Sequence, residues 1–392
     1  MIGAKLGHLV ALLRNERCSL DELLSQQLFK LKALVDHAYL QVPFYRAKYQ
    51  QVGFQPGDLK SIEDLQNLPI ISKTDFHQCS PEEFIDRRLG ARKALIPIRT
   101  SGSSGRTLAF YIDDGYDQFR KAQFLRPYMT NGQKVTDRVL TFKGQPRRHR
   151  KYFELAALLR EKQVSAHLSP ESHLEILRRM KPAIVRGYPS VLALIASRMT
   201  GGAPPVHFPR RIFTDSELLT PSLRRSIEAA FKRRVIDVYG TLETDNIAYE
   251  CEHHQGYHIA IDAVIMEFIN NGRPVQPDVT GEIVCTVLGN YAMPFIRYRL
   301  NDFGVFSDQS CACGRSFPLM TGLKGRTHDF AVTREGRPIS STTLLGEMDR
   351  FATYVEAFQI VQEDIDHFKM ILIPGKDYRR PIADRIQSEF MR

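Results

Sequence analysis

The sequence predicts an α/β fold: a large domain with parallel-rich sheets flanked by helices, a small β-rich subdomain, and a small C-terminal α+β domain. Strands alternate with helices through the middle of the chain, which is typical of a parallel sheet. From about Gly256 short strands are separated by turn residues such as Asn270-Asn271-Gly272. After Gly325-Arg326 a few strands precede one last helix. We therefore predict domains at 1–325 and 326–392, the second one incomplete.

The predicted helices begin at recognisable caps. Ser19-Leu20-Asp21-Glu22 has the form of a capping box, and its helix is expected to end before Val42-Pro43. Shorter helices are predicted over Ser61–Leu68 and Ser72–Phe76, and from Ser80-Pro81. Later helices are predicted after Ser169, after Tyr188, after Thr220 and over Pro381–Met391.

The predicted strands fall into three groups. The parallel group comprises Arg138–Phe142, Ala183–Tyr188, Arg211–Thr214 and Val235–Val238. The β-rich group comprises Val264–Ile269, Gly281–Val287 and Gly304–Ser307, and the C-terminal group comprises Asp329–Thr333, Phe358–Gln362 and His367–Ile373. Because ligands bind at the carboxyl ends of strands in open α/β sheets, functional residues are expected where the parallel strands end.

The composition is that of a globular protein whose ligand is acidic. The chain has 392 residues and a formal net charge of +10, which suits a nucleotide or a phosphorylated cofactor. The densest basic run, Arg147–Lys151, is short and lacks the interleaved aromatics of a nucleic-acid groove, so no nucleic-acid partner is expected. No membrane span or signal peptide is recognisable, so we expect a cytoplasmic protein whose six cysteines are reduced or bind a metal.

A glycine- and hydroxyl-rich loop, Thr100–Thr107, stands between two apolar strand candidates. Glycines let the backbone turn tightly and approach a ligand, and successive N–H groups can form an anion-binding concavity. The candidate ligand-binding residues are Ser101, Gly102, Ser103, Ser104, Gly105, Arg106 and Thr107. The loop predicts a cradle for a nucleotide triphosphate, although the GxxxxGK[ST] spacing is absent. Its composition also fits a flexible hairpin or linker.

Two further sequence motifs accompany this loop. One is Asp237–Glu243 (DVYGTLE), and the other is Ala292–Asp302 (AMPFIRYRLND), which is followed by Gly325-Arg326. Together the three motifs resemble those of the adenylate-forming ligases. Within these ligases they resemble the phenylacetate–CoA ligase-like branch, which includes capsule-biosynthesis-type and coenzyme F390 synthetase-like members. The resemblance extends from about residue 25 to residue 374. It implies that a carboxylate attacks the α-phosphate of Mg-ATP, giving acyl-AMP and pyrophosphate. A thiol, of coenzyme A or of a carrier's phosphopantetheine, then displaces AMP.

The resemblance also implies roles for individual residues. The glycine loop would hold pyrophosphate, with Arg106 in place of the usual lysine. Tyr239 would lie against adenine, and Glu243 would bind Mg²⁺ and act in catalysis. Asp302 would accept hydrogen bonds from both ribose hydroxyls. The remaining candidates are Ser216, Glu217, Gly240 and Thr241 for the nucleotide, and Gly187, Tyr188 and Pro189 for the acyl pocket. Without the resemblance, the same residues fit a core tyrosine, exposed carboxylates and ordinary turns.

Gly325–Asp329 matches the hinge between the two domains of that family. Arg326 is a catalytic candidate, and His328 stands beside Asp329 where the family usually has Asp or Lys. A hinge needs only to absorb a backbone rotation. The histidine at position 328 therefore leaves the hinge assignment in place, but it puts in doubt how fast the two domains change their relative orientation. Members of this family usually carry a lysine in the last segment of the small domain, where it neutralises charge during acyl-adenylate formation. Neither Lys369 nor Lys376 matches it well, so we expect slow acyl-adenylate formation from a chain that ends at Arg392.

Cys251, His258, Cys311 and Cys313 are candidate metal ligands. Three thiols and an imidazole suit a closed tetrahedral zinc site of structural type, and some members of the resembled branch hold a metal with this set. The spacing is not that of a standard finger, so ordinary reduced cysteines in turns are the alternative.

We predict an acyl- or aryl-CoA ligase that uses ATP, Mg²⁺ and coenzyme A on a small carboxylic acid, with a structural zinc. One alternative is adenylation with another acceptor, as in AMP transfer to a deazaflavin by F390 synthetases. The other is a nucleotide-binding protein without turnover. The acid, the acceptor and the oligomeric state stay open, with a homodimer as one alternative.

Overall fold

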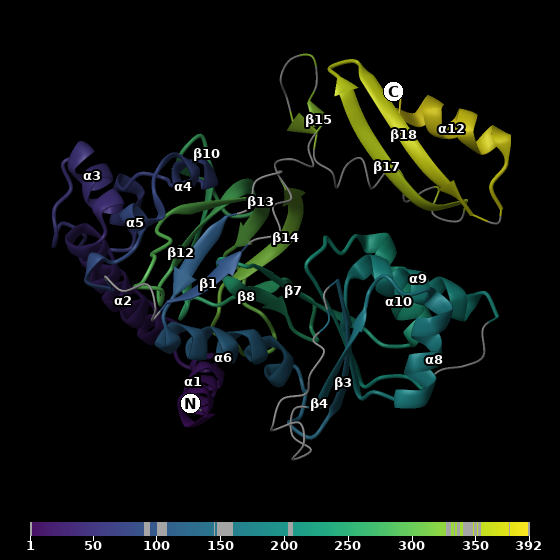
Figure 1. Ribbon diagram of the computed structural model, residues 1–392. Coiled ribbons are helices and arrows are strands. Elements are labelled where there is room, and N and C mark those ends of the chain that lie inside the picture. The colour runs from purple at the N-terminus through teal and green to yellow at the C-terminus, as the bar shows by residue number, and fades with distance from the viewer. Residues whose placement is uncertain are drawn as a thin grey trace.

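The structure is a computed structural model of the 392-residue chain. It describes residues 2–89, 95–99, 108–144, 146, 160–202, 207–326, 331–332, 334, 338–339, 348, 351, 354–375 and 377–390. Figure 1 shows helices around a long curved sheet, and a separate C-terminal hairpin with its own helix. Among the described residues, no helix is both long and apolar enough to cross a membrane.

The N-terminal quarter is helical. Its elements are α1 (Ile2–Asn15), α2 (Leu20–Gln41), α3 (Pro43–Gln51), η1 (Glu63–Asn67), α4 (Lys73–Gln78), α5 (Pro81–Phe84) and η2 (Arg87–Leu89). Helix α2 begins after the predicted cap, because the Ser19 hydroxyl accepts the N–H of Glu22 at 3.3 Å. Helix α3 follows at once, with Pro43 in its first turn, so Val42-Pro43 joins two helices and does not end the helical region.

Strands β1 (Ile96–Arg99) and β2 (Ala109–Ile112) form an antiparallel pair on either side of the glycine loop. Arg99 pairs with Ala109, so the two ends of the loop are held together. The loop Thr100–Thr107 itself lies outside the described residues. Helix α6 (Asp114–Thr130) follows and packs on α1 through a small apolar cluster that includes Leu9, Leu12 and Ala122.

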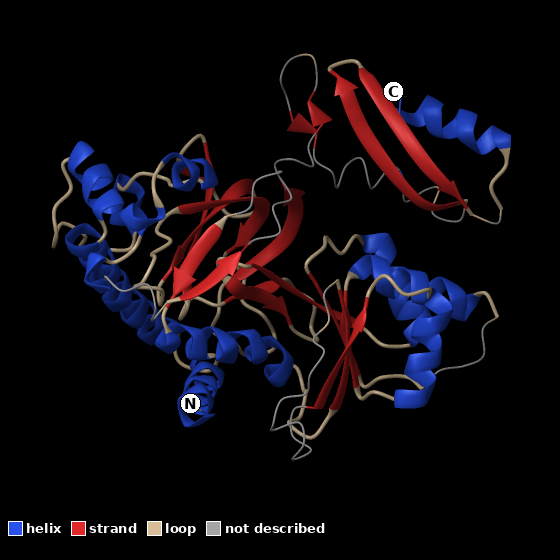
Figure 2. Cartoon of the chain, in the orientation of Figure 1, coloured by secondary structure: helices blue, strands red, loops and turns tan. Residues whose placement is uncertain are grey.

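One twelve-stranded sheet runs through the large domain in the order β11-β10-β12-β13-β14-β9-β8-β7-β6-β5-β3-β4. Its parallel part is β3 (Arg138–Lys143), β4 (Arg160–Ser165), β5 (Ile184–Gly187), β6 (Arg211–Asp215) and β7 (Val235–Thr241). Helices α8 (Pro170–Met180), α9 (Pro189–Thr200) and α10 (Pro221–Phe231) connect these strands and lie together beside them (Figure 2). The predicted alternation of strands and helices is confirmed.

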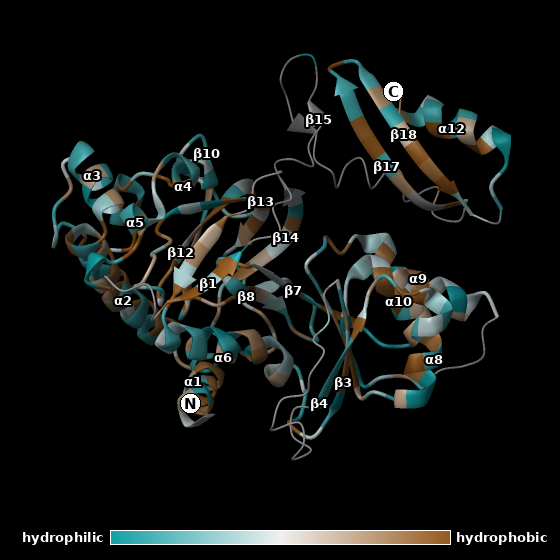
Figure 3. Ribbon diagram, in the orientation of Figure 1, coloured by the Kyte–Doolittle hydropathy of each residue, from teal (hydrophilic) through white to brown (hydrophobic). Residues whose placement is uncertain are grey.

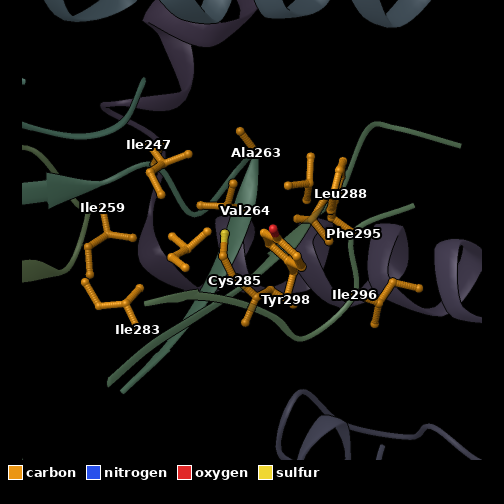
Figure 4. Close-up of a cluster of buried hydrophobic side chains, with 14 of the residues drawn as sticks. Ile247, Ile259, Ala263, Val264, Ile283, Cys285, Leu288, Phe295, Ile296 and Tyr298 are labelled. Carbon is orange, nitrogen blue, oxygen red and sulfur yellow. The ribbon is translucent and has the colours of Figure 1, made fainter. Parts of the chain in front are cut away.

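The rest of this sheet is antiparallel. Its strands are β8 (Asp245–Glu250), β9 (Tyr257–Ile259), β10 (Val264–Asn270), β11 (Arg273–Pro274), β12 (Thr280–Val287), β13 (Tyr298–Ser307) and β14 (Leu319–Arg326). The β-rich region of the sequence is thus joined to the parallel strands by a continuous hydrogen-bond ladder through β9 and β8. Figure 4 shows its apolar face, where Val264, Cys285 and Phe295 pack together.

The C-terminal part consists of β15 (Ala331–Val332), β16 (Pro338–Ile339), β17 (Val355–Asp364), β18 (His367–Pro374) and α12 (Arg380–Phe390). It has a hydrophobic cluster of its own, which includes Phe351, Val355 and Ile386. Figure 3 shows both hydrophobic and polar stretches along its two long strands. This separate core agrees with the proposed boundary after residue 325, which stays a prediction.

Candidate functional site

Tyr239 and Asp302 are in contact near the carboxyl end of strand β7. Tyr239 lies near the carboxyl end of β7, and its hydroxyl donates a hydrogen bond of 2.8 Å to Oδ2 of Asp302 on β13. Both residues are almost fully buried, at 6% and 4% exposure. Three strands separate β7 from β13 in the sheet order, and neighbouring strands are about 4.8 Å apart. A direct contact between them therefore requires a strongly twisted and curved sheet.

The same strand β13 joins the site to the proposed hinge. Asp302 is the ladder partner of Arg326, the last residue of β14. The residue expected to bind ribose thus shares a backbone register with the residue at which the hinge begins. His328 and Asp329, the other hinge candidates, lie outside the described residues.

Glu243 lies in the turn after β7. Its carboxylate lies near Tyr298 at the start of β13, and burial, followed by the charge of Glu243, raises the pKa of the Tyr298 hydroxyl. The Thr244 hydroxyl accepts the N–H of Thr241 at 3.2 Å, which closes the turn. Helix α6 anchors its far side, because Arg120 forms a bidentate ion pair with Asp245 at 2.6 and 3.0 Å.

Gly240 is required by this turn. A Cβ atom at position 240 would lie 1.8 Å from the carbonyl oxygen of Asp245, far inside any van der Waals contact. The ladder between β7 and β8 shifts register between Tyr239 and Gly240, so the strand bulges at this point. The bulge redirects the chain so that Glu243 reaches Tyr298.

Strands β5 and β6 end beside each other and bring the other candidates together. Ser216 adopts a left-handed backbone with φ of 69°, and its hydroxyl donates to Asp215 at 2.6 Å. Glu217 accepts the N–H of Ser190 at 3.1 Å, in the first turn of the helix α9 that begins at Pro189. The Tyr188 hydroxyl accepts the N–H of Gly144 at 3.2 Å. Gly187 packs on Phe142, with a Cβ position 3.1 Å from that side chain.

The sequence analysis missed a buried polar network directly behind this edge. Asp237 accepts hydrogen bonds from the Thr214 hydroxyl and, at 2.7 Å, from the Tyr257 hydroxyl. Burial, and then the nearby Glu250 carboxylate, raise the pKa of Asp237 to about 7. The sequence did contain a signal for this network. Asp237 stands two residues before Tyr239 in the same motif, and alternate residues of a strand lie on the same face, so the two side chains are expected on one face of β7.

The four candidate metal ligands come together as the sequence predicts. The ligand atoms of Cys251, His258, Cys311 and Cys313 all lie within 4.8 Å of one another. Sγ of Cys251 is 3.6 Å from Sγ of Cys311, and Sγ of Cys313 is 3.4 Å from Nε2 of His258. A tetrahedral zinc with bonds of about 2.3 Å to sulfur and 2.0 Å to nitrogen gives ligand separations of roughly 3.5–3.8 Å. These separations fit zinc and exceed the length of a disulfide bond.

The surroundings of the cluster suit a cation held by thiolates. Burial and the nearby Arg315 lower the pKa of His258 to about 4, so its imidazole is neutral, as a metal ligand must be. Arg315 donates to Sγ of Cys313 at 3.2 Å and to Glu16 at 2.8 Å. Burial opposes ionisation of Cys313, but hydrogen-bond donation from Arg315 lowers its pKa below the usual range. Glu16, at the end of α1, also accepts a 2.6 Å hydrogen bond from the Tyr249 hydroxyl.

Lys369 is exposed on β18, 3.9 Å from Glu363, in agreement with a solvated lysine. Lys376 and the nucleotide-loop residues Ser101, Gly102, Ser103, Ser104, Gly105, Arg106 and Thr107 lie outside the described part of the chain. The structure therefore brings together the candidates from β5, β6, β7 and β13, and it leaves the loop as a prediction.

No family model matches the chain. It is 25% identical over 389 residues to the phenylacetate-coenzyme A ligase of Thermus thermophilus, covering 94% of this chain and 85% of the relative. It is 28% identical over 335 residues to the phenylacetate-coenzyme A ligase of Aromatoleum evansii, with coverage of 81% and 74%. Protein CapK of Staphylococcus aureus is 23% identical over 330 residues, with coverage of 81% and 71%.

The fold is similar to that of solved ligases. A crystal structure of 2-hydroxyisobutyryl-CoA ligase in the postadenylation state matches with a TM-score of 0.77 at 22% identity, over 96% of this chain and 83% of that one. An open conformation of the same ligase matches with a TM-score of 0.71 over 96% and 86%. The motifs, the sequence relatives and the fold thus agree in their similarity to the phenylacetate–CoA ligase branch of the adenylate-forming ligases.

Proposed function

We propose that this chain activates a carboxylic acid with ATP as an acyl-adenylate and transfers the acyl group to coenzyme A. Sequence relatives that are phenylacetate-coenzyme A ligases support the reaction. The contact between Tyr239 and Asp302 carries the proposal, because it joins two distant motif residues at the edge where a nucleotide would bind.

In the proposed site, Asp302 accepts hydrogen bonds from the ribose hydroxyls, and the Tyr239 hydroxyl orients that carboxylate. The ring of Tyr239 offers an apolar face to adenine. Gly240 and Thr241 shape the turn, and Ser216 and Glu217 border the nucleotide from β6. Gly187, Tyr188 and Pro189 border the acyl group. Charged phosphates are expected on the loop Ser101–Thr107.

Glu243 is the residue that would hold Mg²⁺. Magnesium takes one or two carboxylates together with phosphate oxygens, and a single glutamate on a fixed turn fits that requirement. When bound, Mg²⁺ would neutralise charge on the phosphates. The chain's own contribution is to fix the carboxylate through Tyr298 and through the Thr241–Thr244 turn. Arg326 is proposed to approach the site when the C-terminal domain turns about the hinge at His328 and Asp329.

The test is pyrophosphate release over a panel of aromatic and aliphatic carboxylic acids, with and without coenzyme A. A ligase releases pyrophosphate with its acid and forms thioester and AMP only when coenzyme A is added. An adenylating enzyme with another acceptor would release AMP independently of coenzyme A. Binding of AMP without turnover on any acid would contradict the proposal and favour a nucleotide-binding protein.

A structural zinc on Cys251, His258, Cys311 and Cys313 is the second part of the proposal. The four ligand atoms lie within 4.8 Å of one another, and a site with four protein ligands leaves no position open for a reacting group. Arg315 would offset the net negative charge of three thiolates around one divalent ion. Metal analysis of unchelated protein should find about one zinc per chain. Freshly prepared protein without zinc would contradict this part alone.

A further inference from the structure

A cavity of about 540 Å³ lies away from the nucleotide residues, and its lining is strongly basic. The residues that line it are Arg210, Arg211, Lys232, Arg233, Arg234, Ile236, Glu252, His253 and His254. Five of these nine side chains carry a permanent positive charge and one carries a negative charge. Nothing in the proposed ligase reaction uses this cavity.

The topology explains why the cations gather. Strands β6 and β7 are parallel, and Ile212 pairs with Val235. Arg210 and Arg211 therefore enter β6 next to the point where Arg233 and Arg234 enter β7. Strand β8 runs antiparallel to β7, so the turn Glu252–His254 after β8 returns to the same edge.

This edge is the amino end of the parallel strands, whereas the nucleotide candidates lie at their carboxyl ends. Tyr239 is four positions after Val235 along β7, which corresponds to roughly 13 Å of strand. A small ligand in the basic cavity would therefore occupy a site separate from the proposed nucleotide site.

Two of the five cations are paired with carboxylates. Arg210 contacts Asp137 at 2.5 Å, and Arg211 contacts Glu252 at 3.0 Å. Within the described ranges, no carboxylate oxygen lies within 4.0 Å of the charged groups of Lys232, Arg233 or Arg234. Arg233 donates to the carbonyl of Lys232 at 2.8 Å and Arg234 to the carbonyl of Glu252 at 3.2 Å, which leaves both charges uncompensated.

Stabilisation of a helix end explains only part of this arrangement. Lys232 and Arg233 follow α10, and cations at a helix C-terminus interact favourably with its dipole. Arg210, Arg211 and Arg234 belong to strand entries and have no such role. Nε2 of His254, a residue that lines the same cavity, is buried and has no hydrogen-bond partner among the described residues. Its side chain is 9% exposed.

We infer that this cavity binds a small phosphorylated anion with more than one phosphate group. A guanidinium group can bind two phosphate oxygens at once, and four arginines from two separate segments, 210–211 and 233–234, line a concave space of suitable size. The site is a concave, partly open pocket bordered by two strand entries and one turn, a shape that favours a small polyanion over a nucleic acid or a membrane surface.

The test uses inorganic tripolyphosphate and the full chain. Hydrogen–deuterium exchange should show protection at 210–211, 232–234 and 252–254. Protection can also occur at the nucleotide edge, by which we mean the proposed nucleotide site around Tyr239, Glu243 and Asp302. The double variant Arg233→Ser/Arg234→Ser should weaken calorimetric binding at this site by tenfold or more and leave AMP binding unchanged. The matched control is Arg179→Ser/Arg225→Ser, which removes two exposed cations from α8 and α10 outside the cavity.

Protection confined to the nucleotide edge would overturn the inference. So would an equal loss of tripolyphosphate binding in both double variants, because that result would reflect net charge and not this cavity. Neither result bears on the ligase proposal, which depends on pyrophosphate release and AMP binding.

Discussion

The nucleotide edge and the thiol–imidazole cluster are built in opposite ways. At the edge, the Tyr239 hydroxyl donates to Asp302, and the Glu243 carboxylate lies near Tyr298. In the cluster, three thiols and one imidazole converge through sulfur contacts and one hydrogen bond from Arg315 to Cys313. Burial raises the pKa of Cys251 and of Cys311, so a cation would have to displace the protons of these thiols, whereas the contact between Tyr239 and Asp302 needs no ligand. Changes at the edge should therefore affect chemistry, and changes in the cluster should affect stability.

The largest effect on chemistry is expected from Glu243→Gln. The substitution keeps the size of the side chain and removes the charge proposed to hold Mg²⁺. We expect adenylation to slow by about 10²–10³-fold, as for the loss of one preorganised electrostatic contact. Pyrophosphate release measures the effect, and the melting temperature serves as the control. A large fall in melting temperature would show that the edge is structural as well.

Cys311→Ser should have the largest effect on stability. Loss of one thiolate should reduce zinc from about one per chain to a small fraction, because structural sites depend on the full ligand set. We expect the melting temperature to fall by about 5 °C or more, at about 2–4 °C for each kcal/mol lost. Turnover per folded molecule should change less. Cys285→Ser is a useful comparison, since Cys285 is buried in the core away from the four ligands.

Asp302→Ala and Tyr239→Phe form a matched pair at the edge. The first removes the carboxylate, and AMP binding should weaken by about tenfold or more, because two hydrogen bonds that the ribose hydroxyls donate to a charged group are lost. The second removes only the hydroxyl that contacts Asp302 and keeps the ring, so its effect should be a few-fold. Calorimetry with AMP measures both. Unchanged affinity in Asp302→Ala would refute the ribose assignment.

A last effect, on the pH dependence of stability, is expected at the buried Asp237. Its pKa of about 7 lies above the unfolded value near 3.8, so the folded state binds the extra proton. Stability from this group is full below about pH 4 and is lost as the pH rises through 7. Asp237→Asn should flatten the pH dependence of the free energy of unfolding over that range. Urea unfolding at several pH values measures it, and an unchanged slope would show that Asp237 ionises normally.

Local sequence signals predicted most of the elements that position the site. Ser19, Ser169 and Thr220 cap the helices that follow them, and DVYGTLE ends a buried strand, as the patterns indicated. Strand β13 was predicted only over its last four residues, because Asn301-Asp302 is typical of a turn. In the structure Asn301 takes a left-handed φ of 60° inside the strand. The strand thus continues through a residue that usually ends one.

Contacts between distant strands were beyond local patterns. The Tyr239–Asp302 hydrogen bond depends on the curvature of a sheet whose strand order only the tertiary structure reveals. The basic cavity was missed for the same reason, since Arg210-Arg211 and Arg233-Arg234 are separate short runs in the sequence. The thiol cluster was predicted from three cysteines and one histidine together, and the family resemblance strengthened the prediction, because the spacing fits no standard finger.

The positions of the metal ligands also bear on how the chain folds. Cys251 and Cys311 are 60 positions apart, and His258 and Cys313 are 55 apart, so no short segment holds even three of the ligands. Closing loops of this length costs chain entropy. Strands β10, β12 and β13 lie within the intervening segment, and their pairing brings the ligand segments together. A zinc ion bound by all four proposed ligands would therefore identify chains whose antiparallel strands have assembled.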